Sequence, residues 1–122
     1  MYGSDYQRRM NAIYEQTRPD FAYGAGSDCC DDIGLLYAAL ALNGEAGEVA
    51  EKVKRIVRGD YEGMSIDEVR TKVQCELGDV LYCVCMICAE MGLELNDVML
   101  SSVMKFESRL KRGVLQGEGD DR

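Results

Sequence analysis

Hydrophobic residues recur along this chain at alternating steps of three and four, the spacing that places side chains on one face of an α-helix. The pattern predicts four helices, at about residues 5–18, 31–58, 66–91 and 97–112. Pro19 follows the first helix and Gly92 follows the third, and both residue types commonly end helices. Asn96 is the expected N-cap of the last helix. The predicted fold class is therefore all-α, with the helices forming a four-helix bundle.

The second and third predicted helices are joined by a turn at 59–64, which has a glycine at each end. Ser65 and Glu68 then match a capping box, which starts the third helix. The two helices are expected to run antiparallel and to face each other along apolar seams. The residues expected to face the core are Tyr6, Met10, Ile13 and Thr17 in the first helix, Leu35, Ala39, Leu42, Ala46, Val49, Val53 and Ile56 in the second, Val69, Val73, Glu76, Val80, Val84 and Ile87 in the third, and Met99, Val103, Phe106 and Leu110 in the fourth.

Residues 80–89 of the third helix are apolar or weakly polar on every side. A helix without a polar face is buried on more than one side, which in a chain of 122 residues indicates a subunit interface. We therefore expect a single domain over residues 1–122 that forms a homodimer or homotetramer. Residues 20–28 are expected to be a plain connecting loop or a lid over a ligand. The glycine-rich segment 114–122 is expected to be a flexible or site-capping tail.

Two acidic motifs lie in the second and third helices, Gly44-Glu45-Ala46-Gly47-Glu48 and Glu76-Leu77-Gly78-Asp79. Each pairs carboxylates three residues apart, which places both on one helix face. The two motifs are also about equally far from the turn, so antiparallel helices bring all four carboxylates to one level. Clustered carboxylates favour a cation, and oxygen ligands favour Mg²⁺ or Mn²⁺ over zinc. The simpler alternative is two solvated acidic faces.

Gly47 and Gly78 lie at nearly the same level of the two helices as these carboxylates. Each costs about 1 kcal/mol relative to alanine inside a helix, so we expect them to serve a purpose. Small residues there would allow a close approach of the two helices, or of a ligand.

Polar and basic residues form a stripe along one face of the last predicted helix, at steps of three and four. They are Ser102, Lys105, Arg109 and Arg112. Cations on one stripe of an acidic protein match a polyphosphate. Ordinary ion pairing with the acidic surface is the alternative.

Composition excludes several classes of function. The net charge of −8 argues against binding of nucleic acid as a polymer. No apolar run is long enough to span a membrane and the first residues lack a signal-peptide pattern, so an intracellular, cytoplasmic protein is expected. Cys85 and Cys88 have zinc-like spacing, but no second pair completes a site, so they are expected in the core. The adjacent Cys29 and Cys30 are expected in a loop, where they could be sensitive to oxidation.

The two acidic motifs, with Val49-Ala50-Glu51-Lys52 after the first and Val80-Leu81-Tyr82 after the second, resemble the MazG family. The resemblance covers nearly the whole chain, is strongest over 42–82 and returns at 105–109. It implies the fold of the all-α nucleoside triphosphate pyrophosphohydrolases, which are dimers or dimers of dimers. Two departures stand out: Ser101 and Ser102 occupy a region where many members have asparagine, and Tyr82 stands where many have tryptophan.

Carried over to this chain, the resemblance implies roles for individual residues. Glu45, Glu48, Glu76 and Asp79 would bind Mg²⁺ and form the catalytic set. The substrate triphosphate would be held by Lys52, Lys105, Arg109 and Arg112. The implied reaction is Mg²⁺-dependent hydrolysis of nucleoside or deoxynucleoside triphosphates to the monophosphate and pyrophosphate. The alternatives are a narrower relative, of the dUTP or phosphoribosyl-ATP type, and a helical dimer that binds nucleotides without turnover.

Overall fold

The structure is a computed structural model that describes residues 2–20, 33–117 and 119. The described part contains four α-helices and no strand: α1 (Gly3–Thr17), α2 (Ile33–Arg58), α3 (Ile66–Met91) and α4 (Leu95–Lys111). The all-α prediction is confirmed for these residues. The possible lid at 20–28 and the pair Cys29 and Cys30 lie almost wholly outside the described residues. None of the described helices is both long and apolar enough to cross a membrane.

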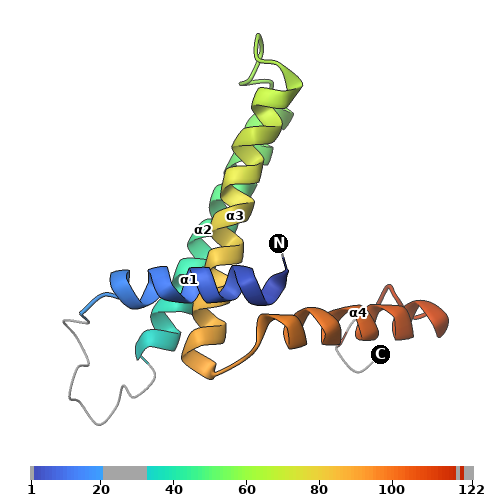
Figure 1. The fold of residues 1–122 in the computed structure, drawn as a ribbon. Helices are drawn as coiled ribbons and strands as arrows, with labels where there is room; N and C mark the ends of the chain where they lie inside the picture. The colour runs from blue at the N-terminus through green and yellow to red at the C-terminus, as the bar shows by residue number, and fades with distance from the viewer. Residues whose placement is uncertain (1, 21–32, 118, 120–122) are drawn as a thin grey trace.

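The α2–α3 hairpin forms a long arm, and α1 crosses the arm near its base (Figure 1). The ends of the hairpin follow the predicted local chemistry. Ser65 and Glu68 complete the capping box, with the Glu68 amide donating to Ser65 Oγ at 3.2 Å and the Ser65 amide donating to Glu68 Oε2 at 2.8 Å. At the other end of α3, Gly92 adopts the left-handed conformation, with φ of 64°.

The arrangement of α4 differs from the predicted bundle. This helix packs against α1 and runs outward from the end of α3, without extended contact with α2 or α3 (Figure 1). It begins at Leu95 with Glu94 as its N-cap, so the prediction that Asn96 is the cap was wrong. Gln7 of α1 fixes this start, because its side chain donates to the Leu93 carbonyl at 2.7 Å and accepts from the Leu95 amide at 2.6 Å.

The core lies where α1 crosses the arm. Its buried side chains form two neighbouring clusters, one of Tyr14, Ala38, Cys83 and Met86, the other of Cys85, Cys88 and Leu95. Cys85 and Cys88 of α3 are therefore small core residues, as predicted, and Cys83 is buried with them, whereas Cys75 of the same helix is exposed. Much of segment 80–89 is buried against helices of its own chain, so its lack of a polar face does not by itself require a second subunit, although Leu81 is 51% exposed.

Several helix faces differ from those that periodicity predicted. In α1, Tyr14 is buried while Ile13 is 46% exposed. In α2, the residues turned toward α3 include Ala38, Ala41 and Glu45, one position around from the predicted seam. In α4, the stripe expected in the core is exposed in the chain, with fractions of 51%, 53%, 49% and 66% for Met99, Val103, Phe106 and Leu110.

Candidate functional site

Three carboxylates from the two helices of the hairpin converge midway along it. Glu45 of α2 and Glu76 and Asp79 of α3 each place one oxygen within 4.8 Å of the others. The antiparallel pairing of α2 and α3 produces this level match, as the spacing of the motifs predicted. Glu48 is not part of the group: it lies on the next turn of α2 and its side chain is exposed.

Lys52 lies next to this acidic group along the hairpin and forms an ion pair with one of its members. Its Nζ lies 3.0 Å from Glu76 Oε1, and both side chains are mostly shielded from solvent. The hydrogen bond with Glu76 raises the pKa of Lys52 above its usual value, so this cation stays charged at neutral pH. Glu76, which periodicity assigned to the core, is thus a half-buried acid with a partner, one of the ways in which such a position is tolerated.

The donor set of the three carboxylates fits a hard divalent cation. All three ligands offer oxygen, which Mg²⁺ and Mn²⁺ prefer, and no histidine exists in the chain to favour zinc. Oxygens that share one Mg²⁺ lie up to roughly 4 Å apart, since each is about 2.1 Å from the ion. The separation within the group, at most 4.8 Å, therefore requires only small side-chain movements.

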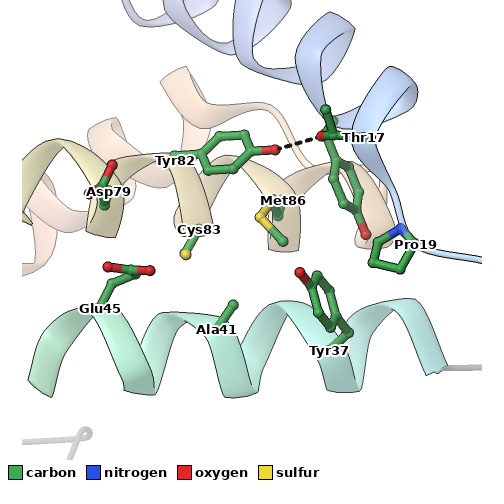
Figure 2. A pocket seen from close by; sticks show the side chains of 10 residues that line it. Thr17, Pro19, Tyr37, Ala41, Glu45, Asp79, Tyr82, Cys83 and Met86 are labelled. Atoms are coloured by element: carbon green, nitrogen blue, oxygen red, sulfur yellow. Dashed lines mark hydrogen bonds between the residues drawn. The ribbon is translucent and has the colours of Figure 1, made fainter. Parts of the chain in front are cut away.

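A cavity of about 420 Å³ opens beside the carboxylates, between α2, α3 and the end of α1. Figure 2 shows Glu45 and Asp79 facing each other at one end, and Tyr37 and Pro19 at the other. Aromatic and apolar side chains form much of the wall between these ends. The full lining is Tyr14, Thr17, Pro19, Tyr37, Ala41, Glu45, Asp79, Tyr82, Cys83 and Met86.

The polar groups of the wall are tied into the fold. Thr17 Oγ1 donates to the Ile13 carbonyl at 2.9 Å, so Tyr82 is the donor in its 3.4 Å contact with Thr17 (Figure 2). Tyr14 donates from its hydroxyl to Glu90 Oε1 at 2.5 Å. Burial and this hydrogen bond raise the pKa of Tyr14 to about 12, so the phenol stays protonated. The cavity therefore has fixed aromatic walls.

Cys83 lies between the carboxylates and the deeper cavity (Figure 2). It is 3% exposed, and burial, together with the charges of Glu45 and Asp79, raises the pKa of its thiol. A neutral thiol is a poor nucleophile. Cys83 is therefore a small wall residue rather than a reactive group.

Apart from Glu45 and Asp79, sequence reasoning did not identify the residues that line the cavity as site residues, although a signal for some of them was present. Tyr37, Ala41 and Glu45 follow one another at steps of four on α2, and so lie on one face. Extending the face of the acidic motif toward the helix start would have found Tyr37. The contribution of Thr17 and Pro19 had no such signal, because it depends on where α1 crosses the arm.

The structure does not bring the basic stripe of α4 to the carboxylates of the same chain, because α4 has no extended contact with α2 or α3. Lys105 is exposed, and its Nζ lies 5.7 Å from the centre of the Phe106 ring. Arg109 is only 3% exposed, with its guanidinium 5.8 Å from the same ring. The exposed Arg112 bonds from Nε to Ser108 Oγ at 3.3 Å.

The glycines of the acidic motifs do not serve close packing within the chain. A Cβ built on Gly44, Gly47 or Gly78 would meet nothing within 4 Å among its described surroundings. A close approach of the two helices is therefore not the reason for Gly47 and Gly78, and that alternative was wrong. The open space beside these glycines leaves one explanation for them, the close approach of a ligand or of another chain.

Comparison with known proteins gives two matches. Residues 35–114 match the profile of the MazG nucleotide pyrophosphohydrolase domain, and this range contains both acidic motifs and the whole of α4. The chain is also similar to the Gene 37 protein of Mycobacterium phage L5, with 42% identity over 111 residues, covering 90% of this chain and 96% of the relative. No solved structure is significantly similar to the chain.

Proposed function

Because this chain belongs to the family of MazG nucleotide pyrophosphohydrolase domains, we propose that it hydrolyses nucleoside or deoxynucleoside triphosphates to the monophosphate and pyrophosphate. The observation that carries this proposal is the meeting of Glu45, Glu76 and Asp79, of which Glu45 and Asp79 line one end of a cavity with aromatic walls. This arrangement suits a ligand that has a planar ring at one end and metal-bound phosphates at the other.

Glu45, Glu76 and Asp79 would hold Mg²⁺, with Mn²⁺ as a possible substitute. When bound, the ion supplies a Lewis acid for the phosphate oxygens and lowers the pKa of a coordinated water. Glu48 lies one turn from Glu45 and is exposed, so it is placed to accept a proton from the attacking water or to add a further ligand. Lys52, held by Glu76, would offset the negative charge of the substrate.

The cavity would hold the nucleoside. Tyr37 and Tyr82 approach it from α2 and α3, and aromatic faces stack favourably on nucleobases. The volume of about 420 Å³ lies within the range of small-molecule sites. Lys105, Arg109 and Arg112 remain the proposed phosphate-binding cations of α4.

We also propose that the protein is a homo-oligomer that acts in the cytoplasm, where its substrates are found. Among the described residues, more large hydrophobic side chains are exposed than buried. Exposed apolar surface on this scale is typical of an interface.

The direct test is a panel of nucleoside and deoxynucleoside triphosphates with Mg²⁺, in which pyrophosphate and orthophosphate release are measured separately. We expect pyrophosphate and the monophosphate as the products. Glu76→Gln should lower kcat at least about 100-fold, a loss of roughly 2.7 kcal/mol in transition-state stabilisation. Glu62→Gln, at an exposed glutamate of the hairpin turn, is the matched control and should retain activity. Orthophosphate as the main product, or a fully active Glu76→Gln, would refute the proposal.

A further inference from the structure

We propose that the cavity beside the carboxylates selects nucleotides whose base carries an exocyclic amino group, as cytosine and adenine do, over those with a carbonyl at the same position, as in uracil and hypoxanthine. This inference rests on the proposed function, because it takes the cavity as the place of the nucleoside. The hydroxyl groups of the wall determine the preference, since the hydrogen bonds that they already make leave them as acceptors.

Two hydroxyl groups meet on the side of the cavity opposite α2, that of Thr17 from α1 and that of Tyr82 from α3 (Figure 2). A hydroxyl has one proton to donate and two lone pairs with which to accept. Thr17 donates its proton to the Ile13 carbonyl at 2.9 Å, so Tyr82 donates its own to Thr17 at 3.4 Å. Both protons are thus used within the protein, and only lone pairs of the two oxygens remain for a ligand.

Tyr14 is a third hydroxyl of the wall whose proton is already used. It donates to Glu90 Oε1 at 2.5 Å, and Arg18 donates from Nε to the same oxygen at 2.8 Å. Because a hydrogen bond to a carboxylate is stronger than one between neutral groups, Tyr14 keeps its proton on Glu90 rather than turning it toward a ligand. Burial raises the pKa of Tyr14 to about 12, so the phenol stays protonated and the bond persists. The hydrogen bonds of all three hydroxyls therefore point into the protein.

Other residues of the wall add little donor capacity. Pro19 has no amide hydrogen, and the side chain of Met86 has no polar hydrogen. The neutral thiol of Cys83 is only a weak donor. At the opposite end, the ionised carboxylates of Glu45 and Asp79 only accept. The cavity is thus rich in acceptors.

A wall rich in acceptors fits a base that brings its own donors. The amino groups of cytosine and adenine each carry two N–H donors, whereas uracil and hypoxanthine present a carbonyl acceptor at that position, beside a single ring N–H. A carbonyl placed against the lone pairs of the wall leaves acceptors on both sides unsatisfied, and a polar site rejects an analogue in this way. Among the narrower activities considered for this chain, dUTP hydrolysis is therefore the one that the wall opposes.

The test compares pairs of nucleotides in which an amino group is exchanged for a carbonyl at one position of the ring: CTP with UTP, and ATP with ITP. Each is assayed with Mg²⁺ for pyrophosphate release. We expect kcat/KM to be at least about 10-fold higher for the amino member. Discrimination in the pyrimidine pair, with slow turnover of both purines, identifies cytosine as the base; the reverse identifies adenine. Equal turnover within both pairs, or a preference for UTP or ITP, would overturn the inference and leave the hydrolase function in place.

Variants of the two meeting hydroxyls test the cause of the preference. Thr17→Val removes the group to which Tyr82 donates and so frees a proton for a carbonyl. The ratio of kcat/KM between the amino and carbonyl members should fall at least about fivefold, mainly through a gain for the carbonyl member. Tyr82→Phe should also lower the ratio, but through a loss for the amino member, because an acceptor disappears and no donor is gained.

Thr71→Val is the matched control for Thr17→Val. Thr71 is also exposed, and its hydroxyl makes the same type of bond within α3, to the Asp67 carbonyl at 2.9 Å. Its removal should leave the ratio unchanged, because Thr71 does not line the cavity. A ratio between substrates does not respond to a general loss of folded protein, so it separates selection from stability. An unchanged ratio in both Thr17→Val and Tyr82→Phe would overturn the inference.

A wild-type protein that hydrolyses no triphosphate would refute the proposed function instead. The base preference would then be judged from binding of the same four nucleotides with Mg²⁺, measured by isothermal titration calorimetry. Tighter binding of CTP than UTP, or of ATP than ITP, would support the inference, and equal binding within both pairs would overturn it.

Discussion

At the scale of single residues, the four acids of the two motifs occupy different environments. Glu45 is half-buried and belongs to the group of three that converges on one point, whereas Glu48 is exposed and outside this group. We predict that Glu45→Gln weakens binding of Mn²⁺, detected by electron paramagnetic resonance, by at least about 10-fold, since it removes a hard ligand. Glu48→Gln should leave the affinity within about threefold and lower kcat, as expected for a proton acceptor. Equal losses of affinity in both variants would instead make Glu48 a ligand.

Replacing Gly78 by alanine is expected to raise the stability of the protein and to lower its activity. Gly78→Ala should raise the free energy of unfolding by about 1 kcal/mol, because alanine favours the helix and its Cβ meets nothing within 4 Å in the chain. The same methyl group should lower kcat/KM if substrate or a second copy uses the space. Thermal denaturation and steady-state kinetics on one preparation test both parts. Gain of stability with unchanged kinetics would show that the space serves neither.

At the scale of elements, an ion pair holds α1 against the hairpin. Arg18 Nε lies 2.8 Å from Glu90 Oε1, and a Cβ on Gly34 of α2 would collide with both of these side chains. Gly34 thus has a packing role that the acidic-motif glycines lack. Because Glu90 of this ion pair also accepts the hydrogen bond from Tyr14, the pair holds one of the residues that line the cavity.

The ion pair between Arg18 and Glu90 makes the stability of the fold dependent on pH. The hydrogen bond from Arg18 lowers the pKa of Glu90 below the usual glutamate value of about 4.5. A lowered folded-state pKa means that the stabilisation is present above about pH 4.5 and is lost as the pH falls through the lower folded value. Glu90→Gln should therefore cost about 1 kcal/mol at pH 7, since Arg18 is partly exposed, and the deficit should shrink in acid. Urea denaturation at pH 7 and pH 3.5 measures this; a constant deficit would contradict it.

At the scale of the whole molecule, the described residues expose more large hydrophobic side chains than they bury, which supports the proposed homo-oligomer. The core is confined to the crossing of α1 with the arm, while the distal arm and α4 expose hydrophobic residues. We predict that the melting temperature rises with protein concentration, by roughly 3–5 °C for each tenfold increase, because association stabilises the folded state by mass action. Calorimetry across a concentration series tests this. Val103→Asp should abolish the dependence, whereas a wild-type protein without it would be monomeric.

The sequence by itself determined the four helices, both ends of α3 and the common level of three of the four carboxylates. These depend on local rules: the capping box at Ser65, the left-handed Gly92 and the rise per residue that brings Glu45 to the level of Glu76 and Asp79. Only the tertiary structure decided which helix faces meet. Periodicity gives a stripe to within about one residue, so it could not distinguish a seam beside Glu45 from one that contains it. Nor could it reveal the cavity, which exists because α1 crosses the hairpin, or the course of α4, whose apolar stripe has the same spacing whether it packs on its own chain or another.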